Sequence, residues 1–467
     1  MTLGILNSSH QIHIMGIGGS GMSSLAQVLL QMGKRVTGCD LRMNATARQL
    51  VRWGAVVSLG HSPQHLEGVD LVIYSTAVDP QNEELKQARA AGIPVLHRSQ
   101  ALAELMNERV GIAVAGAHGK TTVTAMLALV LEWSGLDPTI LIGGELEELQ
   151  GGAKYGQGRY LVAEADESDG SFLRYRPHIA LITSVEPDHL EFYGGSWERL
   201  KGTYARFVDN IHPDGTLVLR VDEEGTRQLQ QSAGKRRVIT YGLDPSARYT
   251  CRDVELGPGK ASCLVLKDKA PLGTLKLQVP GRHNLINALG VIGAAAECGL
   301  TFADTAGHLA NFRGVGRRFQ PIDQVGDILF FDDYAHHPTE LAATLQAARE
   351  GWQRRIVAVF QPHRYSRTRF FWDEFGPALK EADLIALVPI YSPLSEKPSP
   401  EVTSEVLARH IRRQTGKEVL YFDLEGLAAG LAPHLQPGDL VITLGAGDVR
   451  RAGEELAALL REGIDVC

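Results

Sequence analysis

The sequence contains few cysteines, the residue that stabilises small secreted domains through disulfides and that commonly binds structural zinc. Its 467 residues include five cysteines, an odd number, and no C-x-x-C pair occurs. They are scattered along the chain at Cys39, Cys251, Cys263, Cys298 and Cys467. This usage indicates neither a disulfide framework nor a zinc site.

Long apolar runs and a large excess of one charge are also missing. No uninterrupted apolar stretch reaches the roughly 18 residues of a membrane span, and residues 1–10 lack the basic and apolar regions of a secretion signal. The net charge of -7 and the pI near 6.2 argue against a general nucleic-acid binder. We therefore expect a soluble cytoplasmic protein that has no nucleic-acid or membrane partner.

The order of apolar strands and amphipathic helices predicts an α/β protein of three domains. Residues 1–108 are expected to form a Rossmann-like domain with a parallel sheet. Residues 109–320 are expected to form a central domain with a P-loop and a mostly parallel sheet. Residues 321–467 again alternate strands with helices, which predicts a second, doubly wound Rossmann-like domain.

The most informative motif is a glycine-rich turn at residues 116–122, which read GAHGKTT. An apolar run precedes it and a helical stretch follows, so its backbone N–H groups are expected to point at a phosphate. Lys120 would add a cation for the β- and γ-phosphates, and Thr121 a hydroxyl for Mg²⁺. The loop is shorter than the usual P-loop, because Val114 stands where the first glycine is expected. An ordinary turn is the alternative, and the strand–turn–helix context argues against it.

A second glycine-rich turn follows the first predicted strand. Gly16, Gly18 and Gly21 match G-x-G-x-x-G, and Asp40 ends the next strand, where it could accept a hydrogen bond from a sugar hydroxyl. The pattern indicates the diphosphate of a nucleotide but does not say which nucleotide. Glycines that only let a helix approach a strand are the alternative interpretation.

Polar groups also follow two strands of the central domain. Four carboxylates lie within residues 164–169, and Glu164 falls nearest the end of its strand. Because ligands bind at the carboxyl edge of a parallel sheet, Glu164 is the best candidate for a Mg²⁺ contact beside the P-loop. His189 follows the next strand and is expected at the same edge. A solvated acidic loop and a structural histidine are the alternatives.

The C-terminal part contains two more clusters at predicted strand ends. Residues 332–338 place five polar or ionisable groups after the strand 328–331, and Arg364 and Arg367 follow the strand 356–360. Two arginines three residues apart can hold a carboxylate through bidentate hydrogen bonds. The alternatives are a helix start with ion pairs for the arginines and a capped loop for the histidines.

Taken together, these motifs resemble those of the ATP-dependent Mur ligases over nearly the whole chain. The motifs that carry the resemblance are Gly16–Met22, Gly116–Thr122, Glu164–Asp169, Gly281–Asn284, Gly314–Phe319, Asp332–Pro338 and Phe360–Tyr365. The shortened P-loop is the usual form in this family. The chain departs from the usual pattern at Ala117, Val123, Ser184 and Ala335 and over residues 97–100, and none of these changes removes a phosphate, metal or carboxylate-binding group.

The resemblance implies a role for each of the following residues. ATP would contact Gly116, Gly119, Lys120, Thr121, Thr122, Asn284, Arg318 and Asp332. Mg²⁺ would be held by Thr121, Glu164 and His189. The UDP-sugar would contact Gly18, Gly19, Gly21, Asp40, His61 and Ser75. The amino acid would contact Tyr334, His336, Arg364 and Arg367. Catalytic roles would fall to Lys120, His118 and His336, where His336 is either a base or only a binding group.

Within the family, the resemblance is to the ligases that join L-alanine to the lactyl carboxylate of UDP-N-acetylmuramate through an acyl phosphate. It implies ATP as co-substrate, Mg²⁺ as metal, and a place in peptidoglycan synthesis, cell wall biogenesis, cell shape and cell division. A ligase that attaches a recycled tripeptide to the same UDP-sugar is one alternative, and residues 167–172 argue against it. A folylpolyglutamate-type ligase is disfavoured by the extra N-terminal domain. A nucleotide-binding regulator without catalysis would not need the polar clusters of the C-terminal domain.

Overall fold

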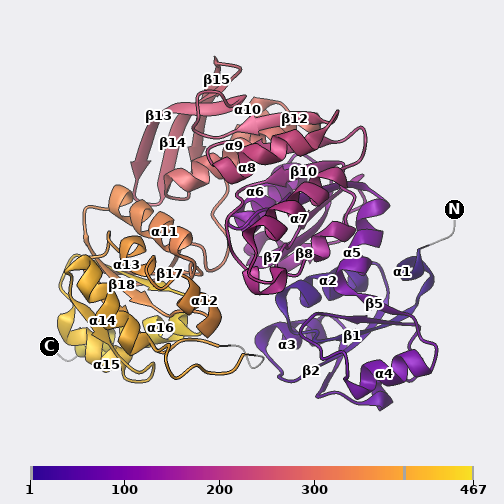
Figure 1. Ribbon diagram of the computed structural model, residues 1–467, viewed down its shortest axis with the longest axis horizontal. Helices are drawn as coiled ribbons and strands as arrows, with labels where there is room; N and C mark the ends of the chain where they lie inside the picture. Colours follow the sequence, from indigo (N-terminus) through magenta and orange to yellow (C-terminus); the bar gives the residue numbers. More distant parts are fainter. Residues whose placement is uncertain (1–3, 393–395, 465–467) are drawn as a thin grey trace. The chain divides into compact units, whose positions relative to one another are not determined.

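The computed structural model describes residues 4–392 and 396–464, so Cys467 lies outside the described residues (Figure 1). The chain divides into two compact units. Unit 1 comprises residues 1–252, 264–275 and 286–312, and unit 2 comprises residues 253–263, 276–285 and 313–467. Three sheets with mainly parallel strands confirm the predicted α/β class. The domain boundaries near residues 108 and 320 stay predictions.

The N-terminal sheet has the strand order β3-β2-β1-β4-β5 and is parallel throughout, as predicted. Its strands are β1 (Gln11–Met15), β2 (Arg35–Asp40), β3 (Val56–Leu59), β4 (Leu71–Tyr74) and β5 (Val95–His97). Its helices are α1 (Ile5–Ser8), α2 (Ser20–Gln31), α3 (Ala45–Arg52), η1 (Pro63–Leu66), α4 (Glu83–Ala90) and α5 (Arg98–Asn107). The strand order reverses between β1 and β4, so the glycine-rich turn after β1 lies at the switch point where such sheets bind ligands.

The central sheet runs in the order β15-β14-β13-β12-β11-β10-β6-β9-β7-β8. Its strands are β6 (Val110–Ala115), β7 (Thr139–Leu146), β8 (Gly151–Lys154), β9 (Tyr160–Glu164), β10 (Ile179–Ile182), β11 (Thr216–Arg220), β12 (Arg237–Tyr241), β13 (Tyr249–Gly257), β14 (Lys260–Lys267) and β15 (Ala270–Leu277). The helical elements are α6 (Lys120–Trp133), η2 (Glu147–Leu149), η3 (Ser171–Arg174), η4 (Leu190–Tyr193), α7 (Trp197–Asp209), α8 (Glu224–Leu229), η5 (Gln230–Ala233), α9 (Arg282–Glu297) and α10 (Phe302–Leu309). β6 lies between β9 and β10, and both neighbours are parallel to it. The loops after these three strands therefore meet at one edge.

Helix α6 is buried along most of its length. Every residue from Val123 to Leu131 is inaccessible to solvent or nearly so. A helix that is apolar on all sides is stable only when other elements surround it. The turn that begins α6 is thereby attached to the core of the domain.

Helix α2 of the N-terminal domain packs against β7 and β8 of the central domain, within unit 1. The buried Ser24 Oγ donates to Ile142 O at 3.0 Å, and Tyr155 N donates to Gln31 Oε1 at 2.6 Å. A Cβ at Gly152 would lie 2.6 Å from Ser24 Oγ, so the close approach requires glycine there. We call this contact the α2 seam.

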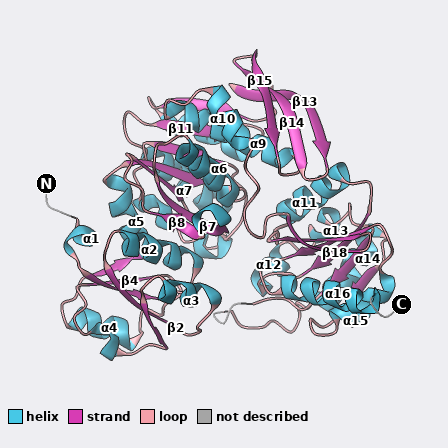
Figure 2. Cartoon of the chain, turned by 180° about the vertical axis from the view of Figure 1, so that it is seen from behind, coloured by secondary structure: helices cyan, strands magenta, loops and turns pink. Residues whose placement is uncertain are grey.

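The C-terminal sheet has the order β16-β17-β21-β18-β19-β20, with only β16 antiparallel to its neighbour. Its strands are β16 (Gln320–Val325), β17 (Ile328–Asp333), β18 (Arg355–Phe360), β19 (Leu384–Leu387), β20 (Val419–Tyr421) and β21 (Asp439–Leu444). The helices are α11 (Pro338–Gly351), α12 (Tyr365–Phe370), α13 (Phe375–Ala378), α14 (Ser404–Thr415), α15 (Leu427–Leu431), η6 (Ala432–His434) and α16 (Val449–Ile464). Figure 2 shows helices on both sides of β18, which is the predicted doubly wound arrangement. Among the helices of the described ranges, none has the length and apolar character needed to cross a bilayer.

Candidate functional site

The glycine-rich turn at residues 116–122 joins β6 to α6 in the predicted way. Gly119 caps the helix with a φ of +79°, and Gly116 has a φ of +136°. A Cβ on Gly116 would overlap Thr183 Oγ1, so no larger residue fits there. Ser184 Oγ accepts a hydrogen bond from His118 N at 3.0 Å. The turn is therefore fixed against the end of β10.

Lys120 lies inside this turn and pairs with a buried carboxylate. Its Nζ donates to Gly116 O at 2.6 Å and to the two carboxylate oxygens of Glu167 at 2.9 and 2.8 Å. Burial alone would lower the pKa of Lys120, but the nearby carboxylates, led by Glu167 and Asp166, raise it above its ordinary value. The ammonium group is thus charged and held within the glycine-rich turn.

Glu167, the partner of Lys120, was not among the site residues predicted from the sequence. Its exposed fraction is 2%, and Tyr193 donates its hydroxyl to the Glu167 carbonyl oxygen. The motif 164–169 contains four carboxylates, and their spacing does not reveal which one turns toward Lys120. The run of acidic residues at 164–169 was the only sequence signal that one of these carboxylates could pair with Lys120.

Thr121 and Glu164, two of the predicted Mg²⁺ ligands, are neighbours. Thr121 Oγ1 donates to Glu164 Oε2 at 3.3 Å, and Gly143 N donates to Glu164 Oε1 at 2.6 Å. Glu164 is the last residue of β9, as predicted. A hydroxyl and a carboxylate are the oxygen donors that Mg²⁺ prefers, so these residues fit the ion.

The two predicted histidines of the central domain lie beside acidic residues. His189 has a φ of +55°, and its Nε2 is 3.5 Å from Asp188 Oδ2. Burial raises the pKa of Glu167 above its ordinary value, against the opposing effects of Lys120 and of nearby His189. His118 Nε2 is 3.5 Å from Glu186 Oε2. His189 is therefore close to the Lys120–Glu167 pair, and the metal role of His189 and the catalytic role of His118 stay predictions.

The sequence-based end of β17 was wrong. We expected the strand to stop at Phe331, yet it continues through Asp332 and Asp333. Asp332 can remain in the strand because its buried carboxylate pairs with Arg317 Nε at 3.0 Å and accepts from Thr443 Oγ1 at 2.8 Å. These contacts occupy the carboxylate that was predicted to bind ribose, and that role stays a prediction.

The other predicted nucleotide contacts of unit 2 lie in well-defined surroundings. Asn284 is buried, and its Nδ2 donates to Pro280 O at 2.8 Å. The Arg318 guanidinium lies over the Tyr334 ring, 5.4 Å from its centroid, and its Nη1 is 3.6 Å from Glu340 Oε1. Their contacts with ATP stay predictions.

The predicted amino-acid site brings together His336 and Arg367. His336 Nδ1 is 2.9 Å from Tyr334 O, which places the proton on Nδ1 and leaves Nε2 as an acceptor. Burial, with the nearby charge of Arg367, lowers the pKa of His336 to about 3. Arg367 Nη1 is 3.1 Å from His363 Nδ1, and the His336 and His363 rings are 5.2 Å apart. Arg364 caps α12 with a φ of +66°.

The N-terminal glycine-rich turn is supported by Asp40. Gly18 N donates to Asp40 Oδ2 at 2.9 Å, Gly19 caps α2, and Gly21 lies in the first turn of that helix. Ser75 directly follows β4, the neighbour of β1. Asp40 was predicted to bind a sugar, and in this structure it binds the turn.

His61 was also predicted to contact the UDP-sugar, but its ring contacts Glu84 and Cys39. Its Nδ1 is 3.2 Å from Glu84 Oε2 and 3.2 Å from Cys39 Sγ. A contact of His61 with the UDP-sugar stays a prediction.

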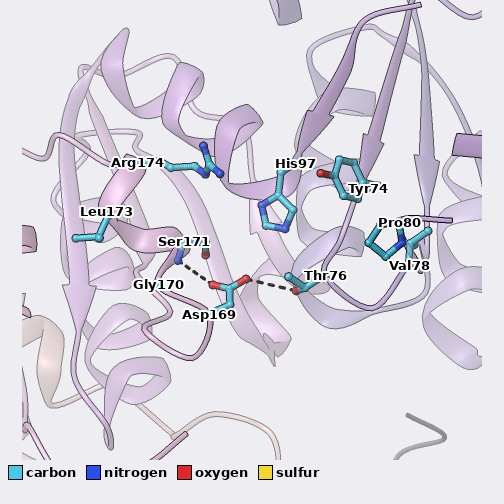
Figure 3. A pocket seen from close by; sticks show the side chains of 10 residues that line it. All are labelled: Tyr74, Thr76, Val78, Pro80, His97, Asp169, Gly170, Ser171, Leu173 and Arg174. Carbon is cyan, nitrogen blue, oxygen red and sulfur yellow. Dashed lines mark hydrogen bonds between the residues drawn. The ribbon is translucent and has the colours of Figure 1, made fainter. Parts of the chain in front are cut away.

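A cavity of about 500 Å³ lies where the carboxyl ends of β4 and β5 face η3 (Figure 3). It is lined by Tyr74, Thr76, Val78, Pro80, His97, Asp169, Gly170, Ser171, Leu173 and Arg174. Asp169 accepts hydrogen bonds from Thr76 Oγ1 at 3.4 Å and from Ser171 N at 2.9 Å. Sequence reasoning missed this cavity because its two walls are almost 100 residues apart in the chain.

Comparison with known proteins identifies the family. Three Mur ligase profiles match in order: "Mur ligase family, catalytic domain" over residues 11–110, "Mur ligase middle domain" over 114–295, and "Mur ligase, glutamate ligase domain" over 317–447.

Relatives and solved structures match over nearly the full length. The UDP-N-acetylmuramate–L-alanine ligases of Symbiobacterium thermophilum and Pelotomaculum thermopropionicum are both 45% identical, covering 97% and 98% of this chain and 95% and 99% of their own. The crystal structure of UDP-N-acetylmuramate-alanine ligase from Thermotoga maritima has a TM-score of 0.83 and 29% identity, covering 97% of this chain and 99% of its own. A murein peptide ligase of Psychrobacter arcticus has a TM-score of 0.70 and 25% identity, covering 97% and 98%. The glycine-rich turn, the three sheets and these matches lead to one conclusion: the chain belongs to the Mur ligase family.

Proposed function

We propose that this protein is an ATP-dependent ligase that forms an amide bond between L-alanine and the lactyl carboxylate of UDP-N-acetylmuramate, in peptidoglycan precursor synthesis. The observation that carries the proposal is the position of Lys120 in a phosphate-binding turn beside the acidic strand ends. The full-length similarity to relatives named UDP-N-acetylmuramate–L-alanine ligase supports this choice of substrates.

The first chemical step activates a carboxylate, which is a poor acylating agent. The lactyl carboxylate attacks the γ-phosphate of ATP in line, and the products are an acyl phosphate and ADP. The Lys120 ammonium neutralises charge that develops on the phosphate oxygens. Thr121 and Glu164, with His189, would hold Mg²⁺, which supplies further charge neutralisation when it is bound.

The second step joins the amino acid. The neutral amine of L-alanine attacks the acyl carbon, and inorganic phosphate leaves. Arg364 and Arg367 would bind the carboxylate of L-alanine through bidentate hydrogen bonds. His336 Nε2, as an acceptor, would orient the amine.

The cavity beside η3 is our candidate for part of the UDP-sugar site. It lies at the carboxyl edge of the N-terminal sheet, where nucleotides bind in such folds. Thr76, His97 and Arg174 offer hydrogen-bond donors to a sugar or a phosphate.

Phosphate release tests the function directly. The purified protein, given ATP, Mg²⁺, UDP-N-acetylmuramate and L-alanine, should release phosphate, and omission of either substrate should stop steady release. A tripeptide in place of L-alanine tests the murein peptide ligase, whose structure also matches this chain. Turnover with the tripeptide and none with L-alanine would overturn the proposal.

The metal ligands predict a change in Mg²⁺ requirement. Glu164→Gln and His189→Ala should each raise the Mg²⁺ concentration for half-maximal activity by roughly tenfold or more, because each removes a proposed ligand. Glu132→Gln is the control, since Glu132 pairs with Lys154 in the same unit. Titration curves that coincide with those of the parent protein would show that Glu164 and His189 do not bind the metal.

The pH profile separates the two roles left open for His336. With a pKa lowered to about 3 by burial and Arg367, the ring is neutral well below neutral pH and is a weak base. The value of kcat/KM for L-alanine should therefore rise with the fraction of free amine and show no inflection near about 6.5, the ordinary histidine pKa. An inflection there that disappears in His336→Asn would instead make His336 the base.

A further inference from the structure

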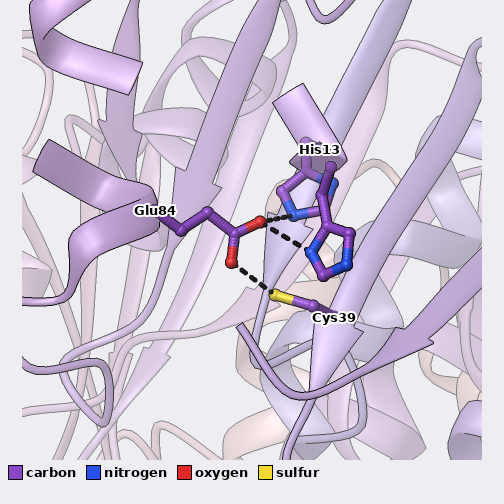
Figure 4. A group of neighbouring side chains, drawn as sticks. His13, Cys39 and Glu84 are labelled. Carbon is purple, nitrogen blue, oxygen red and sulfur yellow. Dashed lines mark hydrogen bonds and ion pairs between the residues drawn. The ribbon is translucent and has the colours of Figure 1, made fainter. Parts of the chain in front are cut away.

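The N-terminal domain contains a cluster of metal-binding side chains that the proposed reaction does not use. His13 comes from β1, Cys39 from β2, His65 from η1 and Glu84 from α4, and one donor atom of each lies within 4.8 Å of the others. Figure 4 shows His13 and Cys39 directed at the Glu84 carboxylate. We propose that these four residues bind a transition metal ion of the zinc type.

The distances in the cluster suit tetrahedral coordination. Glu84 Oε1 is 2.9 Å from His13 Nε2 and 3.0 Å from His65 Nδ1, and Glu84 Oε2 is 3.4 Å from Cys39 Sγ. Zinc bonds of about 2.0–2.3 Å place neighbouring ligand atoms about 3.3–3.8 Å apart. Small side-chain adjustments would therefore make room for the ion.

His13 provides an independent indication of a ligand. Its exposed fraction is 1%, and its Nδ1 is 2.9 Å from Thr37 Oγ1, which orients the ring. Its Nε2 faces Glu84 but has no hydrogen-bond partner of acceptable geometry within the described residues. A buried imidazole nitrogen that points into a cluster, with the other nitrogen held by a second partner, is the usual arrangement of a metal-binding histidine.

The charges of the cluster fit a divalent ion. A Cys39 thiolate and the Glu84 carboxylate carry two negative charges, and His13 and His65 are neutral as ligands. Zn²⁺ would make the buried site neutral overall, and the thiol proton would leave to solvent as the sulfur–metal bond forms. Nitrogen and sulfur donors disfavour Mg²⁺ and Ca²⁺, so this site differs from the proposed phosphate-binding Mg²⁺ site.

Cobalt spectroscopy tests the proposal on the full-length protein. After chelator treatment, the protein is titrated with Co²⁺ in excess Mg²⁺. One equivalent should bind with the visible bands of tetrahedral Co²⁺ and a thiolate-to-metal charge-transfer band, and Zn²⁺ should displace it. Cys39→Ser should abolish the charge-transfer band, and His65→Gln should weaken binding by roughly a hundredfold or more.

Matched variants make the result decisive. Cys298→Ser and His212→Gln remove the same residue types elsewhere in unit 1 and should leave the Co²⁺ spectrum unchanged. If Cys39→Ser fails to fold, His65→Gln decides, because His65 is partly exposed. Absence of tetrahedral bands in the parent, or a spectrum that Glu164→Gln abolishes and His65→Gln leaves intact, would overturn the proposal.

Discussion

Replacement of Lys120 by methionine is expected to lower turnover by roughly three orders of magnitude. The methionine retains an unbranched apolar stem and removes the ammonium group that pairs with Glu167. No charge would then neutralise the transferred phosphoryl group from within the glycine-rich turn. Phosphate release at saturating ATP, UDP-N-acetylmuramate and L-alanine measures the effect.

The control for this variant must separate catalysis from folding. Removing Lys120 leaves the buried Glu167 carboxylate without its partner, which costs about 3–5 kcal/mol of stability. The double variant Lys120→Met/Glu167→Gln removes both charges and should fold while remaining inactive. Lys154→Met, which removes an ion-paired lysine elsewhere in unit 1, should keep normal turnover. A folded double variant with parental turnover would refute the assignment of the turn.

Loss of Arg364 or Arg367 should raise the KM for L-alanine by roughly ten- to a hundredfold, with little effect on that for ATP. A bidentate contact with a carboxylate contributes about 1.5–3 kcal/mol, which corresponds to this range. Arg367 is 7% exposed and lies in the His336–His363 cluster, so its loss should have the larger effect. Initial rates at varied L-alanine and at varied ATP measure both constants.

Two kinds of variant sharpen this test. Arg367→Lys should restore affinity only in part, because an ammonium group lacks the planar fork of guanidinium. Arg369→Ala is the matched control on α12, since that side chain is 61% exposed and 3.7 Å from Glu401. An equal rise in the KM for ATP, or an unchanged KM for L-alanine, would show that the two arginines do not bind the carboxylate of L-alanine.

The fold could be predicted where local pattern and sheet geometry agree. Apolar runs followed by glycine-rich turns located β1 and β6, and the alternation of strands and helices predicted parallel sheets. Because the carboxyl ends of parallel strands share an edge, Thr121 and Glu164 could be expected together although 43 residues separate them. The same reasoning brought His336 and Arg367 into one cluster.

The rest depends on long-range packing that a local pattern does not contain. β21, from residues 439–444, lies between β17 and β18, although it follows both in the chain. Strand order is decided by the packing of whole helices and strands, so it could not be predicted. Likewise, only the fold shows that Lys120 pairs with Glu167 among four carboxylates, and that Asp332 pairs with Arg317. The zinc-type cluster escaped detection because its ligands come from four elements.

The α2 seam has a consequence for substrate selection. Helix α2 begins at the glycine-rich turn of residues 16–21. Through Ser24 and the close approach at Gly152, the helix packs against the central domain, which contains the second glycine-rich turn at residues 116–122. The span between the two turns is therefore set before any ligand arrives. Under the proposed function, a sugar nucleotide bound at the first turn would have to reach, with its carboxylate, the γ-phosphate of ATP bound at the second. On this proposal, the α2 seam would make the enzyme select substrates by their length, so that molecules too short or too long for that span would bind unproductively even when they resemble the substrate chemically.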